Sequence, residues 1–404
     1  MDTIFKLAWR NIWRNHRRTY ITMASIFFAV LFSAFMVAFQ KGGWDRMIDN
    51  VVNYYFGYVQ VHQKGYWNEQ SIDKAFAVPA EIEEMDLAYV PRIESFALAS
   101  AGNATSGVMV TGTDPAAEDS LSKLSTRLVS GQYFSGNEPA ALIAEGIAKN
   151  LKLGVNDTIV LISQGYHGVN AAGKYPIAGI VKFPSPDLNK RMVYLPLETA
   201  QQLYGAEGLV TTLALDLDDK DAAPKAVKDL QSKLPAEEYE VMDWKELIPD
   251  LLEAREADAA GAYVMLFVLY LIISFGIYGT ILMMAKEREY EFGVLVSIGM
   301  NRLKLGLTIW LEVIILGILG SIAGILGAIP LVYYFHVKPL NFDSFGENMG
   351  DIYEKWGFDP IFPTAFELPV FYNQALIVFL ITSILALYPL IKIYRLQPVK
   401  AMRA

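Results

Sequence analysis

The sequence predicts a membrane α-helical protein with four transmembrane helices and a large inserted α+β extracytoplasmic domain. Of its 404 residues, 53% are hydrophobic and only 19% are charged. The hydrophobic residues gather in four long runs, and the segments between the runs alternate between basic and acidic. A soluble protein of this length is expected to spread its apolar residues over many short periodic segments instead.

Each of the four runs is long enough to cross about 30 Å of hydrocarbon, which requires roughly 20 helical residues. They are residues 20–39, 262–285, 305–335 and 371–391. The first two contain no charged residue, and the third contains one acid, Glu312. We expect the first run to be retained, because it is longer than the about 7–15 apolar residues of a cleaved signal peptide.

The charges beside the four runs predict the orientation of the chain. Residues 1–19, 286–304 and 392–404 are rich in Lys and Arg, whereas residues 336–370 hold two Lys against six acids. Basic residues near span ends mark the cytoplasmic side. Both termini and residues 286–304 are therefore predicted to be cytoplasmic, and residues 40–261 and 336–370 extracytoplasmic. The large domain is acidic, since residues 41–258 carry 19 Lys and Arg against 32 Asp and Glu.

The first 19 residues are predicted to form an amphipathic helix in the cytoplasmic headgroup layer. At 100° per residue, the basic side chains share one arc and the apolar ones lie opposite. The basic set is Lys6, Arg10, Arg14, Arg17 and Arg18, and the apolar set is Ile4, Phe5, Ala8, Trp9, Ile12 and Trp13. The alternative is a basic topology signal without a defined helix.

The segment between the first two spans alternates short strand and helix patterns. Strands are predicted near 53–63, 97–110, 140–143, 158–162, 175–181 and 192–195, with a β-α-β unit over 209–242. Residues 43–52 and 243–258 have apolar side chains at helical spacing, and we expect them to continue the first two spans as stalk helices. The chain contains no repeat, so a pathway between subunits would require a dimer.

Several chemistries are excluded by missing residues. There is no cysteine, and the net charge of −9 disfavours nucleic acid as a partner. The Gly-x-x-x-x-Gly-Lys-Ser/Thr loop that binds ATP phosphates is absent, and the four histidines are too scattered to suggest a zinc site. We expect a non-catalytic subunit without a cofactor of its own, so any ATP and Mg²⁺ that act with it would have to be bound by a separate chain.

Span three carries small residues and one acid. Small residues permit close helix contact, either within the subunit or at a dimer interface. They are Gly317, Gly320, Gly324 and Gly327. Glu312 lies about 10 Å inside the span at 1.5 Å per residue. An acid there is either functional or paired with a basic residue, and we expect the pairing.

Aromatic and methionine side chains are concentrated at the outer ends of spans one and two. They could line a cavity for acyl chains, or they could face lipid at the interfacial belt. The candidates are Phe35, Met36, Phe39, Trp44, Tyr263, Phe267 and Tyr270.

The loop at 286–304 begins with a charged cluster and continues with an apolar stretch over 292–298. Gly299 can end a helix. We expect a short helix along the membrane that couples to a soluble partner; the alternative is a loop whose charges only set topology. The candidate coupling residues are Glu287, Arg288, Glu289, Glu291, Phe292, Gly293, Gly299, Met300, Asn301 and Arg302.

This loop resembles the signature of the FtsX-like permeases, whose pattern is close to E-R-x-x-E-[FI]-G-[VI]-L-x-[AS]-[IL]-G. Other segments resemble the family in order along the chain. They are Leu-Ala-Trp-Arg-Asn-Ile-Trp-Arg at 7–14, Glu-Gly-Ile-Ala at 145–148, Val-Tyr-Leu-Pro-Leu at 193–197 and Arg-Leu-Gln-Pro-Val-Lys-Ala-Met-Arg at 395–403. The family includes macrolide-exporting, cell-division and lipoprotein-releasing subunits, and this chain looks nearest to the last of these.

The resemblance implies a four-span subunit that pairs with a second permease, identical or related, and binds two copies of a P-loop ABC ATPase. It also implies a MacB-like periplasmic domain that does mechanical work on substrate outside the membrane. In the lipoprotein-releasing branch, one subunit uses a proline-bearing hairpin to recruit a soluble carrier. The corresponding hairpin at 164–174 has no proline; its candidate contacts are Gln164, Tyr166, His167, Asn170 and Lys174.

The predicted function is that of an ABC transporter permease in a bacterial inner membrane, moving lipoprotein or other lipidic substrate toward the outer membrane. Two alternatives are also compatible with the sequence. One is efflux of drugs or peptides with a periplasmic adaptor. The other is signalling that controls a cell-wall hydrolase without moving substrate.

Overall fold

The structure, a computed structural model, describes residues 2–14, 16–85, 87–134, 136, 138–217, 219–345, 360–395 and 397. Most of the tail motif at 395–403 and the centre of the loop at 336–370 lie outside these residues. The chain divides into two compact units. The membrane unit comprises residues 1–45, 255–341 and 361–404, and the sheet unit comprises residues 46–254 and 342–360.

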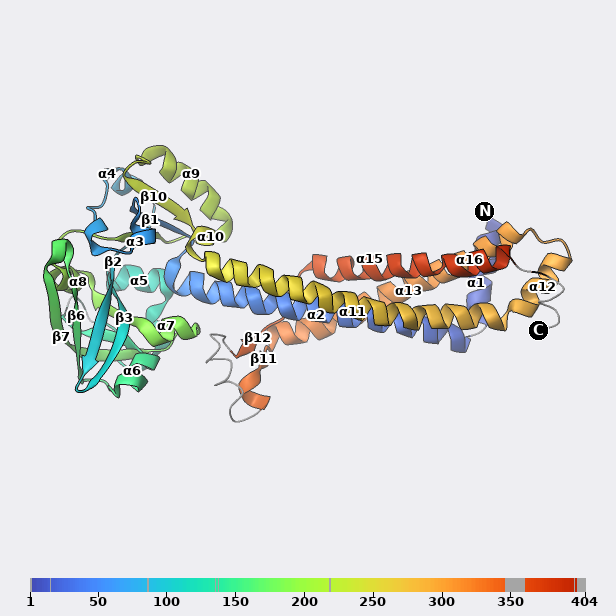
Figure 1. Ribbon diagram of the computed structural model, residues 1–404, viewed down its shortest axis with the longest axis horizontal. Helices are drawn as coiled ribbons and strands as arrows, with labels where there is room; N and C mark the ends of the chain where they lie inside the picture. Colours follow the sequence, from blue (N-terminus) through green and yellow to red (C-terminus); the bar gives the residue numbers. More distant parts are fainter. Residues whose placement is uncertain are drawn as a thin grey trace. The chain divides into compact units, whose positions relative to one another are not determined.

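The membrane unit is built from long helices (Figure 1). Within the described residues, four helical segments are long and apolar enough to span a membrane, as predicted. The helices are α1 (Asp2–Arg14), α2 (His16–Val51), α11 (Pro249–Glu287), α12 (Glu289–Ser297), α13 (Arg302–Val337), α15 (Leu368–Leu385) and α16 (Leu387–Tyr394). Helices α2 and α11 each carry the chain from one unit into the other.

The helices extend beyond the predicted spans, with one difference at the second stalk. Residues 43–51 continue α2, as expected. Residues 243–258, however, do not form one helix: α10 (Trp244–Leu247) is separate, and α11 begins only at Pro249. The side chain of Asp243 accepts from the amides of Lys245 and Glu246 in a capping box, which starts a new helix there. Proline is favoured in a first helical turn, which explains the second start.

Helix α13 is the centre of the membrane unit and contacts α1, α15 and α16. The segment after β12 (Ile361–Phe362), which pairs with β11 (Leu340–Asn341), packs on α2. The amide of Ala365 donates to the carbonyl of Ala38 at 2.8 Å. A Cβ on Gly42 would lie 2.3 Å from the carbonyl of Pro363, so only glycine fits at this crossing.

The sheet unit contains a ten-stranded, mostly antiparallel sheet in the order β10-β1-β9-β2-β3-β8-β5-β7-β4, with β6 paired to β2 and β7. Its parallel pairs are β3 with β8 and β5 with β7. The strands are β1 (Val59–Gln63), β2 (Tyr89–Ala101), β3 (Ala104–Thr113), β4 (Leu128–Gly131), β5 (Ala141–Ala144), β6 (Thr158–Gln164), β7 (Asn170–Val181), β8 (Met192–Pro196), β9 (Thr212–Leu215) and β10 (Tyr239–Asp243).

Short helices cover the sheet and enclose two apolar cores (Figure 1). One core lies under α6 and α8, and the other lies between β1, β9 and α9. The helices are α3 (Tyr66–Glu69), η2 (Ile72–Lys74), α4 (Ala80–Glu83), α5 (Pro115–Ser122), η3 (Leu124–Arg127), α6 (Glu145–Leu151), η4 (Tyr166–Gly168), α7 (Pro186–Arg191), α8 (Leu197–Tyr204), η5 (Lys220–Ala222) and α9 (Ala223–Lys233). The predicted β-α-β unit is β9-α9-β10, and its two strands flank β1 instead of pairing with each other.

The strand predicted over 53–63 begins later than expected. Residues Val52–Phe56 form a π-helical turn, η1, directly after α2, and β1 starts only at Val59. The amide of Gly57 donates to the carbonyl of Val52 at 2.7 Å, which closes the wider turn. Gly57 has a φ of 71°, a conformation that glycine adopts without strain.

Candidate functional site: the coupling region and its ionic network

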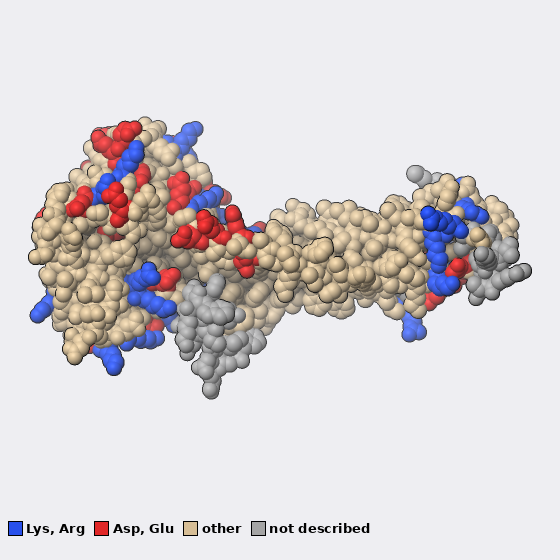
Figure 2. All heavy atoms as spheres, viewed as in Figure 1, with Lys and Arg blue, Asp and Glu red and all other residues tan. Residues whose placement is uncertain are grey.

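The coupling region lies at one end of the membrane unit, where α12 joins α11 to α13. Helix α12 ends where Gly299 adopts a φ of 99°, as its sequence position suggested. The side chain of Asn301 then accepts from the amide of Leu303 at 2.9 Å and caps α13. In Figure 2, basic and acidic atoms occur together at this end, whereas the apolar middle of the membrane unit shows neither.

A buried ion pair connects the coupling region to α13. Nη1 of Arg288 lies 2.8 Å from one carboxylate oxygen of Glu312 and 3.1 Å from the other. Both side chains are almost fully buried, with relative exposures of 7% and 1%. This confirms that the intramembrane acid pairs with a basic residue. Removing one member of such a pair leaves an uncompensated charge, which costs about 3–5 kcal/mol in soluble proteins.

The amino-terminal helix joins the same network. Nδ2 of Asn11 donates to Glu312 at 2.6 Å, and Arg14 donates to Glu291 at 2.6 Å. Arg288 also donates to Glu291, at 3.3 Å. Helix α1 is therefore a defined helix, as predicted, and it packs against other helices of the subunit. Its Ala8 and Ile12 are buried, and α1 packs on α13.

A second acid of α12 contacts the end of the chain. Glu289 accepts from Lys286 at 2.9 Å and from Lys392 of α16 at 3.4 Å. The hydrogen bond from Lys286 lowers the pKa of Glu289. Burial acts to raise the pKa of Glu291, but the hydrogen bonds and charges of Arg14 and Arg288 outweigh it and lower that pKa. Both carboxylates are therefore charged near neutral pH.

The ten predicted coupling residues fall into two groups. Arg288, Phe292 and Gly293 are buried inside the subunit, so they hold α12 in place and present no surface to a partner. The other seven are exposed or partly exposed: Glu287, Glu289, Glu291, Gly299, Met300, Asn301 and Arg302. Beside them a shallow hollow of about 510 Å³ is lined by residues that include Val296, Leu303 and Tyr394. Ile298 is 75% exposed and presents an apolar side chain next to it.

The sequence did not single out Asn11 or Lys392, and it identified Arg14 only as one of five basic residues. The partners of Asn11 and Arg14 lie 301 and 277 residues away in the sequence, and the partner of Lys392 lies 103 residues away. Local spacing cannot reveal such contacts. The one available signal was a polar Asn11 beside apolar Ile12 on a helix with an otherwise basic polar face.

The glycines of span three pack within the subunit against two neighbouring helices, α2 and α15. A Cβ on Gly320 or Gly324 would lie 2.8 or 2.7 Å from Ile26 or Val30 of α2, and Gly327 meets Phe27 of the same helix. Gly317 faces α15 instead. Within this subunit the glycines therefore allow close helix contact, and the alternative of a free dimer interface does not apply to the face that they form.

The candidate cavity residues point in different directions. Phe39 stacks on Phe35 and on Phe362, and Phe35 also contacts Phe335 at a tilted angle. Nε1 of Trp44 donates to Asp258 at 2.6 Å, and the hydroxyl of Tyr270 donates to Gln374. Tyr263 and Phe267 are 72% and 65% exposed, and Met36 is partly buried. Within one subunit these side chains do not converge on a common space.

The predicted hairpin is shorter than expected. Gln164 already pairs with Asn170, so the turn consists of residues 165–169, and Lys174 lies along β7 opposite Val160. Tyr166 and His167 are therefore at the tip, where the amide of His167 donates to Asp73 at 2.6 Å. Phe96 and Leu98 of β2 and Ile162 of β6 are about half exposed on nearby strands, with Leu98 directly opposite Ile162.

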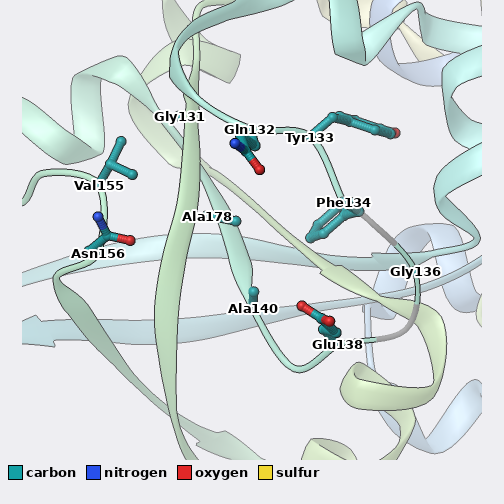
Figure 3. Close-up of a pocket in the computed structure, with 10 residues that line it drawn as sticks. All are labelled: Gly131, Gln132, Tyr133, Phe134, Gly136, Glu138, Ala140, Val155, Asn156 and Ala178. Carbon is teal, nitrogen blue, oxygen red and sulfur yellow. The ribbon is translucent and has the colours of Figure 1, made fainter.

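A hollow of about 410 Å³ lies elsewhere in the sheet unit (Figure 3). It is lined by Gly131, Gln132, Tyr133, Phe134, Gly136, Glu138, Ala140, Val155, Asn156 and Ala178. The hydroxyl of Tyr133 donates to the carbonyl of Pro115 at 2.8 Å, which fixes one wall. None of the predicted site residues lines this hollow.

Comparisons with known proteins agree with this architecture. The model of the MacB-like periplasmic core domain matches residues 19–233, and that of the FtsX-like permease C-terminal region matches residues 263–398. The lipoprotein-releasing system transmembrane protein LolC of Xylella fastidiosa (strain 9a5c) is 24% identical over 325 residues, which are 78% of this chain and 76% of the relative. The protein of the same name in Neisseria meningitidis serogroup B (strain MC58) is 21% identical over 61% of each chain.

Among solved structures, the periplasmic region of MacB from Actinobacillus actinomycetemcomitans covers 52% of this chain and 98% of its own, at 12% identity and a TM-score of 0.34. The family assignment rests on the two sequence models, of which the first alone covers more than half of the chain. This protein belongs to the FtsX-like and MacB-like family of ABC transporter permeases, and it is a multi-pass inner-membrane protein.

Proposed function

We propose that this chain is the membrane subunit of an ABC transporter that extracts lipoproteins, or related lipidic substrates, from the inner membrane for transfer toward the outer membrane. ATP hydrolysis would reside in a separate ATPase chain, which would hold the nucleotide and Mg²⁺. The support for the substrate class is that relatives covering most of the chain are lipoprotein-releasing subunits.

The observation that carries the mechanism is the ionic network around Arg288. It ties α12 to α13 through Glu312 and to α1 through Glu291, so α12 is fixed to several helices. Glu289 also contacts Lys392 of α16 at 3.4 Å, so a docked ATPase that shifts α12 would move α1, α13 and α16 with it. We infer that the exposed side of α12, with Ile298 and the hollow beside Met300, is the docking surface for the ATPase.

The distribution of charges supports the proposed orientation. With both termini and α12 in the cytoplasm, the basic residues of that end obey the positive-inside rule. The acidic sheet unit would then lie in the periplasm. This arrangement puts the nucleotide motor and the substrate-handling unit on opposite sides of the membrane.

A second permease subunit, identical or related, is also part of the proposal. Helix α11 is the least buried of the four spans, and it exposes large apolar side chains such as Phe267 and Phe275. We infer that the partner subunit packs on the side formed by α11. Tyr263 and Phe267, which have no shared cavity within one subunit, would then face a space between two subunits. Two permeases would bind two ATPase copies.

Efflux of drugs or peptides is the second candidate, and the proline-free hairpin favours it. A carrier hook of the lipoprotein-releasing type is expected to have a proline, whereas the tip here is Gly165-Tyr166-His167-Gly168-Val169. Photo-crosslinking from position 167 in cells separates the two functions. A soluble lipoprotein carrier or a lipoprotein in the crosslink supports sorting, and an adaptor with a helical hairpin supports efflux.

The direct test of function uses proteoliposomes that contain the chain, its co-purifying permease and ATPase, and a triacylated lipoprotein. The proposal expects lipoprotein to leave the membrane only when ATP is hydrolysed. The control replaces ATP with a non-hydrolysable analogue. ATP hydrolysis without lipoprotein release, together with ATP-driven movement of a drug or peptide, would replace this function with efflux.

A further inference from the structure

Helix α2 ends inside the sheet unit on a buried guanidinium. Its continuation, η1, finishes at Phe56, and the last carbonyls of a helix have no partner within it. Here side chains of the sheet supply the partners. Nη1 of Arg92 donates to the carbonyl of Tyr55 at 2.6 Å, and Nε2 of Gln60 donates to the carbonyl of Phe56 at 2.7 Å. A cation at this end also matches the negative end of the helix dipole.

Arg92 is itself held rigidly. It lies on β2 with no exposed surface, and its Nε and Nη2 donate to the two carboxylate oxygens of Glu118, each at 2.8 Å. Glu118 lies on α5, is equally buried, and also accepts from Thr113 at 3.1 Å. A bidentate arginine–carboxylate contact fixes the orientation of the guanidinium as well as its distance from the carboxylate. The remaining nitrogen of the guanidinium, Nη1, is thereby held toward the carbonyl of Tyr55 in η1.

The side chains of η1 also contact residues of the sheet unit. The hydroxyl of Tyr55 donates to Glu94 at 3.0 Å, and the guanidinium of Arg127 lies 3.2 Å from the centre of the Tyr54 ring. A buried ion pair is often no more stabilising than apolar side chains of similar size, so stability alone does not account for Arg92 and Glu118. The π-helical turn that they hold is a rare element that is frequent at functional sites.

We propose that Arg92, oriented by Glu118, is a positioning residue that anchors the end of the first transmembrane helix to the sheet, so that movement of the helix is passed to β2 during transport. Arg92 contacts neither substrate nor nucleotide in this role. The inference rests on the proposed function, because it assumes that ATP-driven motion of the spans acts on the sheet unit.

The test replaces the pair with apolar residues of similar size, Arg92→Met with Glu118→Leu. This change removes the anchor together with the buried carboxylate of Glu118. The buried Glu94, which lies 3.8 Å from Nη1 of Arg92, loses that cation but keeps its hydrogen bonds from Tyr55 and Thr212. The matched control is Lys149→Met with Glu145→Leu, which removes a 3.0 Å ion pair on α6 in the same unit, away from η1. Each variant is reconstituted with the co-purified permease and ATPase and a triacylated lipoprotein. ATP hydrolysis, lipoprotein released per ATP, and hydrogen exchange of residues 50–58 are measured.

The anchored arrangement predicts that the Arg92/Glu118 variant hydrolyses ATP normally but releases about tenfold less lipoprotein per ATP, a typical coupling effect. Hydrogen exchange of residues 50–58 becomes faster, while hydrogen exchange of the strands in the apolar core under α6 and α8 stays slow. The control variant matches the wild type in all three measurements. Unchanged release per ATP and unchanged exchange in a folded Arg92/Glu118 variant would overturn the proposal.

Two further outcomes remain decisive. If the double variant does not fold, Arg92→Lys replaces it, because one ammonium cannot reproduce the planar fork that holds both Glu118 and the carbonyl of Tyr55; the same criteria apply. If the wild type hydrolyses ATP but releases no lipoprotein, the proposed function fails. The exchange of residues 50–58 then still decides whether Arg92 anchors η1.

Discussion

The guanidinium of Arg288 contacts both carboxylate oxygens of Glu312, and this pair fixes the start of α12 to the third span. The sequence suggested Arg288 as a contact for a partner, but its side chain is buried inside the subunit. Glu312 also accepts from Asn11, so three helices meet at one buried carboxylate. Substitutions should therefore separate the residues that hold α12 in place from the residues that face a partner.

We expect Arg288→Met or Glu312→Leu alone to lower the thermal unfolding midpoint in detergent by several degrees, because each leaves one buried charge without its partner. The double variant should recover most of that loss. Thermal unfolding of the four proteins in a double-mutant cycle measures the coupling between the two residues. Additive effects of the two substitutions would show that the pair contributes nothing beyond its separate members.

Substitution on the exposed side of α12 should act on partner binding alone. We expect Ile298→Asp to reduce recovery of the ATPase by about tenfold or more, which corresponds to about 1.4 kcal/mol of binding free energy. Its unfolding midpoint should match the wild type, since this side chain is 75% exposed. The control is Phe96→Asp, a half-exposed apolar position in the sheet unit, which should leave recovery unchanged. Full recovery with Ile298→Asp would move the docking surface elsewhere.

The contacts of α12 should depend on pH in one direction. The pKa values of Glu289 and Glu291 are lower in the folded protein than the ordinary value of 4.5. A carboxylate of this kind contributes stability above its unfolded pKa and loses that contribution as the pH falls through its folded pKa. We therefore expect α12 to stay ordered at pH 7 and to loosen only below pH 4.5.

A spin label at Tyr290→Cys reports this change, because the chain has no other cysteine. The label should become more mobile as the pH falls below 4.5. In a Glu289→Gln, Glu291→Gln background the label should already be mobile at pH 7. Equal mobility of the two proteins at pH 7 would rule out a role for these carboxylates in ordering α12.

The glycines of span three should tolerate no side chain where they meet α2. A Cβ on Gly324 would lie 2.7 Å from Val30, so we expect Gly324→Ala to destabilise the protein by about 1–3 kcal/mol through overpacking. Gly276→Ala on α11 is the control, because nothing lies within 4 Å of its Cβ position. That change should be neutral or should stabilise by up to about 1 kcal/mol. Chemical denaturation in mixed micelles measures both, and equal effects would exclude close packing at Gly324.

The sequence alone predicts the elements that depend on local pattern. Uninterrupted apolar runs identify the four spans, and Gly299 marks the end of α12 because only its neighbourhood is needed for that inference. The second stalk was predicted correctly over 249–258, which α11 continues, but apolar spacing hid the separate short helix at 244–247 and the new start at Pro249. The contacts of Arg92 with Tyr55 and Glu118 could not be predicted, because they join residues 37 and 26 positions apart across a sheet and a helix.

The side of the membrane on which α12 lies decides whether a cytoplasmic ATPase can act on it while the sheet unit works outside. Single cysteines at Tyr290 in α12 and Thr105 in β3 are treated with a membrane-impermeant maleimide in spheroplasts and in inverted vesicles. We expect Thr105→Cys to be labelled in spheroplasts and Tyr290→Cys only in inverted vesicles. Labelling of both positions from the same side would contradict the proposed transport mechanism.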